Sequence, residues 1–222
     1  MERNRRLFLL VPKLTWMPRI LAITMAFSLG SGAVASTSVP SLHVAGLALL
    51  MTSGEAVQAL RKQKASVQTV IKSGCVSDYL AMHRSEVPMS DRDGHCVESI
   101  QATYGGGSLL LHFTEDVPRR PGVSVLTTIA LNYPTDDAVL SRVVADVGPP
   151  SLTDGKQPWT VAMWCFGFTC TDMDKTLENR YAGPVLLVHQ GGGLTLNDTG
   201  DANRRQDQSD RVLESHGVRR VP

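Results

Sequence analysis

The chain has 222 residues, of which 42% are apolar, and a formal net charge of +1. This length and composition allow a buried core, arranged as one larger domain or two small ones. Without the export signal described below, the remaining chain has a net charge of −3, which argues against nucleic acid as a partner because binding phosphate requires a concentrated basic face.

The first 35 residues have the pattern of a removable export signal. A basic flank precedes an apolar stretch from Ile20 to Leu29, and small residues at 33–35 offer a cleavage site. Cleavage would remove five basic residues and one acidic residue, leaving 17 basic and 20 acidic residues. The pattern therefore predicts a periplasmic or secreted protein.

Two alternatives concern this segment. Met17 is a possible true start, which would give a shorter signal of ordinary proportions. The second alternative is that the segment stays uncleaved as a membrane anchor. Lys13 and Arg19 interrupt its apolar stretch, however, and a membrane-spanning helix needs roughly 20 apolar residues. We expect no stable membrane span after signal cleavage.

An even number of cysteines follows the signal, which predicts two disulfides in an oxidising compartment. Sequence proximity favours one bridge between Cys75 and Cys96 and another between Cys165 and Cys170. A zinc site is the rival interpretation, but the spacings lack a paired C-x₂-C pattern. No metal and no cofactor is expected.

The first predicted elements follow a short polar lead-in. A capping-box pattern at Thr52 and Glu55 predicts a helix from about Ser53 to Lys64. Further along the chain we expect a short strand at 67–71, a short helix at 75–83, a loop at 85–94, and strands at 96–104, 109–113 and 123–133. Gly105, Gly106 and Gly107 predict a tight hairpin turn between two of these strands.

A second series begins at Pro134. Thr135 can cap a helix whose apolar stripe ends before Gly148. Strands are then expected at 159–166, 184–189 and 194–196, with a short helical turn at 177–181 and a second glycine turn at 191–193. The two glycine turns lie 86 residues apart and the two capping threonines 83 apart, which predicts that helix and hairpin recur together.

The predicted fold class is therefore α+β, with an antiparallel sheet, helices on one face, and two tandem helix-plus-hairpin repeats. We divide the chain into a signal peptide (1–35), a first α+β repeat (36–133), a second α+β repeat (134–199) and a polar flexible tail (200–222). The tail mixes charges of both signs and is expected to be disordered or loosely helical.

The sequence contains no catalytic signature. Asp91 and Asp93 begin like a calcium loop, but no carboxylates continue the spacing. His112, His189 and Asp198 are the residues that a catalytic set between the repeats would use. No nucleophile elbow, zinc-protease motif or phosphate-binding loop accompanies them, so no catalytic residue is assigned.

Four aromatic residues near the second cysteine pair are the binding candidates: Trp159, Trp164, Phe166 and Phe168. In a strand, Trp164 and Phe166 share a face. Large aromatic side chains usually fill the interior, and the alternative is an exposed patch that contacts a partner or glycan.

The opening of the predicted exported chain resembles a known superfamily. Gly46 and Leu47 before Met51-Thr52, then Glu55-Ala56 and Ala59-Leu60, are similar to the opening of the outer-membrane-assembly lipoprotein (SmpA/OmlA) and β-lactamase-inhibitor-protein-like superfamily. That resemblance implies a helical pair packed on an antiparallel sheet, with two such units in tandem in the inhibitor type. No inhibitor contact residue is carried over.

These observations predict an exported, non-catalytic protein of the bacterial envelope. Its sheet surface would bind an envelope protein or a cell-wall component. The alternatives are a periplasmic hydrolase-type enzyme with a site between the repeats and a small-molecule carrier, which would need a large apolar pocket.

Overall fold

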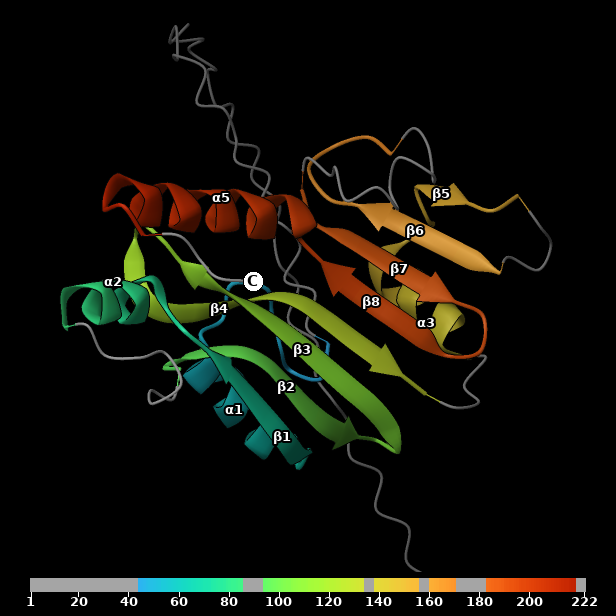
Figure 1. Cartoon of the computed structure of the whole chain (residues 1–222). Helices are drawn as coiled ribbons and strands as arrows, with labels where there is room; N and C mark the ends of the chain where they lie inside the picture. Colours follow the sequence, from blue (N-terminus) through green and yellow to red (C-terminus); the bar gives the residue numbers. More distant parts are fainter. Residues whose placement is uncertain (1–43, 86–93, 134–137, 156–159, 171–182, 219–222) are drawn as a thin grey trace, which may run out of the picture. The chain divides into compact units, whose positions relative to one another are not determined.

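One antiparallel sheet organises the molecule (Figure 1). The computed structural model describes residues 44–85, 94–133, 138–155, 160–170 and 183–218. Within them the sheet has eight strands in the order β1-β2-β3-β4-β8-β7-β6-β5. The helices are α1 (Ser53–Lys62), α2 (Val76–Ser85), α3 (Ala138–Val147) and α5 (Thr199–Ser215). The predicted α+β class with an antiparallel sheet is confirmed.

The sheet consists of two consecutive strand sets. The first strand set comprises β1 (Ser66–Ser73), β2 (Cys96–Tyr104), β3 (Gly107–Asp116) and β4 (Arg120–Asn132). The second strand set comprises β5 (Leu152–Thr153), β6 (Val161–Cys165), β7 (Val185–His189) and β8 (Gly193–Asn197). The sets meet where β4 pairs with β8, and all described residues belong to one compact unit.

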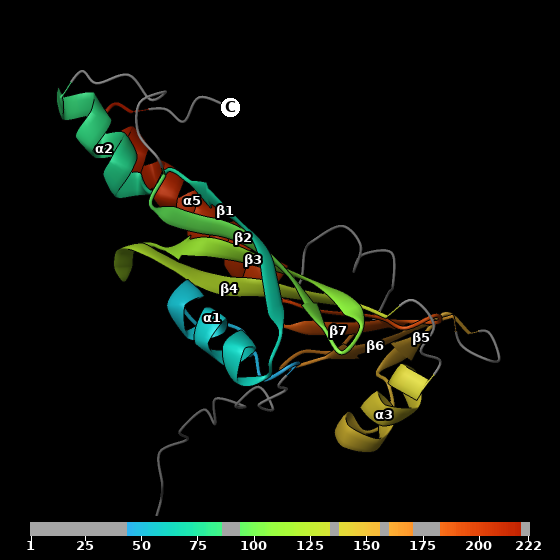
Figure 2. The ribbon, with the colours of Figure 1, turned by 90° about the horizontal axis from the view of Figure 1, so that it is seen from below.

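The main core lies between α1, α3 and one face of the sheet (Figure 2). Strand alternation sends every second side chain to this face, including Leu111, Ile129 and Leu196, which are almost completely buried. Leu60 of α1 and Val143 of α3 pack against the same cluster. Because both strand sets contribute to it, the core is continuous across the β4–β8 pair.

Helix α1 begins where the capping box predicts. The Thr52 hydroxyl accepts from the Glu55 amide, and the Glu55 carboxylate accepts from the Thr52 amide at 2.7 Å. These hydrogen bonds lower the pKa of Glu55. The cap that Thr135 was expected to provide for α3 lies outside the described residues.

Both glycine turns close hairpins, as predicted, but they differ in form and in place. Gly105 and Gly106 form a two-residue loop with φ of 56° and 83° between β2 and β3, a geometry that favours glycine. The β7–β8 loop has three residues, because His189 pairs with Gly193. The Gly105–Gly106 turn joins the second and third strands of the first strand set. The β7–β8 turn joins the third and fourth strands of the second strand set.

The C-terminal segment differs from the predicted flexible tail. Residues from Thr199 to Ser215 form α5, with Asp198 as its cap. Leu213 packs with Val76, Val117 and Val218 in a second cluster beside α2. Helix α5 lies on the sheet face opposite α1 and α3 (Figure 2), so the helices are not confined to one face. Tertiary contacts order a sequence that is too polar to indicate a buried helix by itself.

The predicted cysteine pairing is confirmed. Cys75 bonds to Cys96 with their Cα atoms 5.3 Å apart, and Cys165 bonds to Cys170 with theirs 5.9 Å apart. The first bridge joins the start of α2 to the start of β2. The second closes a short turn after β6. Disulfides persist in oxidising environments, so the chain is suited to a compartment outside the cytosol.

Candidate functional site

The aromatic binding candidates do not form an exposed patch. Trp164 is 3% exposed and Phe166 is 9% exposed, and both belong to the main core. The indole Nε1 of Trp164 donates to the Gly148 carbonyl at 2.9 Å. The prediction that the two side chains share a face is correct, but that face packs toward α3. The two side chains therefore fill the interior, and the exposed-patch alternative finds no support at these two positions.

The other two aromatic candidates give no surface site either. Phe168 is partly buried and packs in a small cluster with Met163 and Val185, on the opposite side of β6 and β7 from the main core. Trp159 lies outside the described residues, as do Asp91 and Asp93 of the calcium-like segment.

The open sheet face, defined here as the side opposite α1 and α3, is the most extended candidate surface. Of the described helices, α5 packs on β3 and β4 on this side, and α2 packs beside α5 and contacts β4. Cross-strand pairing puts His112 beside Thr128, and Thr128 beside Asn197. Exposed side chains of this face are Gln101, Ser108, His112, Asn132 and His189, and half-exposed ones are Thr103, Leu110, Thr128, Ala130, Leu187 and Thr195.

The predicted catalytic candidates lie on this face but do not meet. His112 belongs to the cross-strand row that ends at Asn197, whereas His189 pairs with Gly193. Those rows cross β8 four positions apart, a distance of about 13 Å along the strand. An acid–base pair requires hydrogen-bond reach, so these histidines cannot act on one another.

Asp198 has a structural task at the start of α5. Its Oδ1 accepts from the Asp201 amide at 3.0 Å, while its own amide donates to the Thr127 carbonyl at 2.9 Å. Burial, together with the charge of Asp201, raises the pKa of Asp198. The raised pKa of Asp198 is therefore explained by its place as the N-terminal cap of α5, close to β4.

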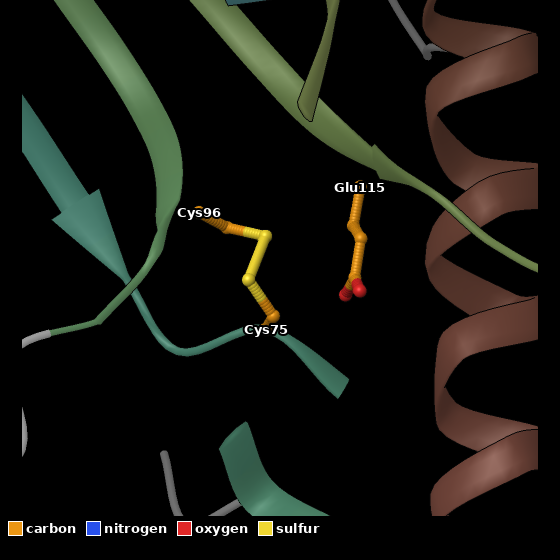
Figure 3. Close-up of side chains that lie close together, drawn as sticks. All are labelled: Cys75, Cys96 and Glu115. Carbon is orange, nitrogen blue, oxygen red and sulfur yellow. A yellow bond between two sulfur atoms is a disulfide. The ribbon is translucent and has the colours of Figure 1, made fainter. Parts of the chain in front are cut away.

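Three potential metal-ligating residues lie together: the two cysteines of the first disulfide and one glutamate. Cys75, Cys96 and Glu115 are buried, and Figure 3 shows the Glu115 side chain beside the two bonded sulfurs. The sulfurs are joined to each other, and a disulfide does not supply thiolate ligands. Glu115 accepts hydrogen bonds from the Val76 amide at 2.8 Å and the Gly122 amide at 2.7 Å. In the oxidised protein the carboxylate thus ties α2 to β3 and β4.

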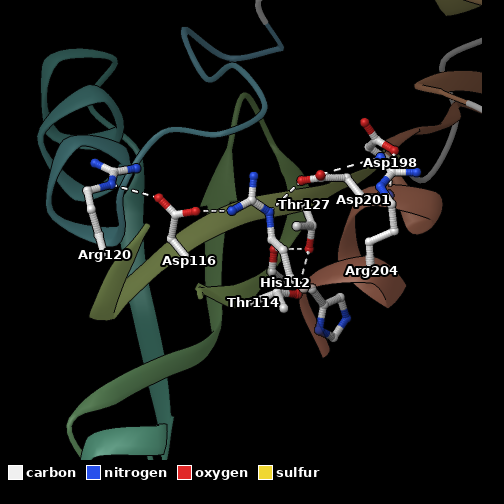
Figure 4. Close-up of polar contacts among 9 residues, drawn as sticks. His112, Thr114, Asp116, Arg120, Thr127, Asp198, Asp201 and Arg204 are labelled. Carbon is white, nitrogen blue, oxygen red and sulfur yellow. Dashed lines mark hydrogen bonds and ion pairs between the residues drawn. The ribbon is translucent and has the colours of Figure 1, made fainter. Parts of the chain in front are cut away.

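A buried ion network attaches α5 to the end of β3 (Figure 4). Asp116 is 2% exposed; it pairs with Arg205 of α5 and accepts from Arg120 Nε at 2.7 Å. Arg205 also donates to Asp201 at 2.5 Å. Burial alone would raise the pKa of Asp116, but its two arginine partners outweigh burial and lower it.

The sequence analysis missed this network. Asp116 and Arg205 are 89 residues apart, and neither belongs to a local motif. The only usable signal was the four-residue spacing of Asp201 and Arg205, which suits an ion pair on one helix face. That spacing predicts the helix but not the strand that it packs against.

Comparison with known proteins adds no assignment to this geometry: no family model matches the chain, and no curated protein or solved structure is significantly similar to it. None of the described helices is long and apolar enough to cross a membrane. The site must therefore be interpreted from its own chemistry.

Proposed function

We propose that the protein is an exported, non-catalytic binding protein of the bacterial envelope, acting in the periplasm or after secretion. The open sheet face is the surface that it uses, and the bound component is a protein or a cell-wall polymer. The signal-like residues 1–35 and the two disulfides support the location.

The observation that carries this proposal is the composition of the open sheet face. Hydrogen-bonding side chains such as Gln101, His112 and Asn132 alternate with half-exposed Leu110 and Leu187. A mixed polar and apolar surface on a rigid sheet is suited to macromolecular recognition, where a partner covers apolar groups and satisfies polar ones. The separation of the two histidines favours binding over hydrolysis.

We further propose that the chain consists of two tandem α+β repeats, as the superfamily resemblance implies. The order of strands supports this: α1 precedes the first strand set, α3 precedes the second, and the sets run inward to a shared β4–β8 pair. Both helices pack on the same sheet face. If the two strand sets are matched strand by strand in chain order, β8 corresponds to β4. The β7–β8 glycine turn then corresponds to the β3–β4 turn rather than to the turn at Gly105–Gly107.

A photo-crosslinking amino acid placed at Leu110 or Thr195 tests the proposed surface in cells of the source organism. Ala145, an exposed residue of α3 on the other side of the sheet, is the matched control position. Both sheet positions are expected to give the same adduct, and Ala145 none. A discrete band identifies a protein, whereas a product released by a cell-wall hydrolase identifies the wall polymer. Equal labelling from Ala145, or no adduct from either sheet position, would disprove the use of this face.

A further inference from the structure

A second, smaller feature lies away from the centre of the open sheet face. A cavity of about 300 Å³ opens where the strands of the first strand set end beside α5. Cys96 of the disulfide forms part of its wall, with Phe113 and Thr114 of β3 and Gln206 of α5. Figure 3 shows the disulfide and Glu115 at this place, with α5 to their side at the right of the view. Ligand pockets range from about 300 to 1,000 Å³, so the cavity suits a small molecule.

A buried hydroxyl in the wall has no partner within the described part of the chain. Ser124 is 3% exposed, and its Oγ makes no hydrogen bond. Buried polar atoms are nearly always hydrogen-bonded to protein, water or a ligand. Ser124 pairs with Glu115 across β3 and β4, so the two side chains lie on the same side of the ladder.

The charge of the cavity wall indicates which kind of ligand would hydrogen-bond to Ser124 and Glu115. Glu98 and Glu115 both line the cavity, and no Lys, Arg or His does so among the described residues. Each Glu115 oxygen already accepts one backbone hydrogen bond. A carboxylate has about four acceptor sites in all, so both oxygens can accept another. The wall thus offers acceptors and negative charge to a donor.

We propose that this cavity binds a small organic cation through an ammonium group. The ammonium donates to the Glu115 carboxylate and to Ser124 Oγ, while Glu98 adds charge at the opening and the ring of Phe113 contacts the carbon chain. Charge-assisted hydrogen bonds of this kind are stronger than neutral ones. A neutral or anionic molecule of the same size lacks either the charge or the donors, so the site discriminates by charge.

Three probes of similar size test the proposal by NMR titration of the purified, oxidised protein: n-propylammonium, 1-propanol and propionate. We expect n-propylammonium to bind at least tenfold more tightly than 1-propanol, with shifts at Glu98, Thr114 and Ser124, and propionate not to bind. Equal affinity for the ammonium and the alcohol would overturn the proposal. So would an absence of shifts in this cavity at tens of millimolar probe.

Two variants with intact wall packing locate the site. Ser124→Ala removes only the unpartnered hydroxyl, and Glu98→Gln removes one exposed charge. Each is expected to weaken n-propylammonium binding about threefold or more, whereas Glu214→Gln, which removes an exposed charge on α5, leaves it unchanged. Unchanged affinity in both test variants would overturn the proposal. Glu115→Gln is avoided because that carboxylate accepts two backbone hydrogen bonds. The outcome is independent of crosslinking at the open sheet face.

Discussion

The two strand sets share one sheet but are stabilised differently. The first has strands of 8 to 13 residues, is covered by α1 on one face and contacts α5 on the other. The second has strands of two to five residues and depends on α3 and on its pairing with β4. A short set can therefore remain ordered when a longer neighbour supplies the central strand.

The strongest way to test this difference is to make matched cavities in the two sets. Leu111 in the first and Leu186 in the second are both 0% exposed, so Leu→Ala should cost about 4 kcal/mol at either position. Because the main core is continuous, we expect a single cooperative unfolding transition in both variants, measured by urea denaturation. Two separate transitions would contradict a shared core.

The buried ion network joins the first strand set to α5, and the described part of the second strand set has no equivalent. Asp116→Asn leaves Arg205 with only Asp201, and we expect a loss of about 3 kcal/mol in the free energy of unfolding. Asp207→Asn, at an exposed position of the same helix, is the control and should change stability little. A variant as stable as the control would show that α5 is not held by this pair.

The same network predicts a pH dependence with a defined sign. Its arginine partners lower the pKa of Asp116 below the reference value of 3.8, so its stabilisation is fully present above about pH 4. It is lost as pH falls through the lower folded-state pKa. The stability difference between the wild type and Asp116→Asn, measured by denaturation at several pH values, should therefore shrink in acid. A difference that grows in acid would contradict this assignment.

The disulfides differ in the length of chain that they close. Loop-closure entropy predicts that replacing Cys75 and Cys96 by serine costs about 3 kcal/mol, and replacing Cys165 and Cys170 about 2 kcal/mol. The reason is their sequence separations of 21 and 5 residues. Thermal unfolding of the two double variants measures both costs. The reverse ranking would show that native-state contacts, rather than loop length, decide these contributions.

The smallest expected effects concern the two glycine turns. A Cβ added at Gly106 or Gly191 meets no atom within 4 Å, so the cost of Gly→Ala arises from the backbone alone. We expect about 1 kcal/mol at Gly106 and somewhat more at Gly191, whose φ of 95° lies further from the left-handed helical region. Chemical denaturation resolves such differences, and a stabilised alanine variant at either position would contradict the assigned turn geometry.

The parts of this fold that could be predicted are those specified locally. Thr52 and Glu55 specify the start of a helix, and the glycines specify hairpin turns. The export signal predicts that the cysteines form disulfides, and their closeness in the sequence predicts which ones pair. Side-chain alternation was also right for Trp164 and Phe166, but a pattern of period two does not say which face is covered. That depends on where α3 packs, which no local signal contains.

The errors arose where distant residues decide the outcome. The buried positions of α5 include Arg205, Ser209 and Leu213, a stripe of mostly polar residues that looks solvent-exposed in the sequence. Arg205 can be buried because it pairs with Asp116 of β3 as well as with Asp201 of its own helix, and the sequence does not show the distant partner. The equivalence inferred from the two glycine turns also failed in strand order, because similar turns serve different positions in a sheet.

The position of α5 in the chain has a consequence for synthesis. Asp116 emerges from the ribosome long before Arg205, so a partly made chain carries this acid without its main partner. The first strand set can collapse while translation continues, but α5 cannot cover it until residues 199–215 have been made. Chains truncated before residue 205 should therefore remain more sensitive to protease than chains that include α5.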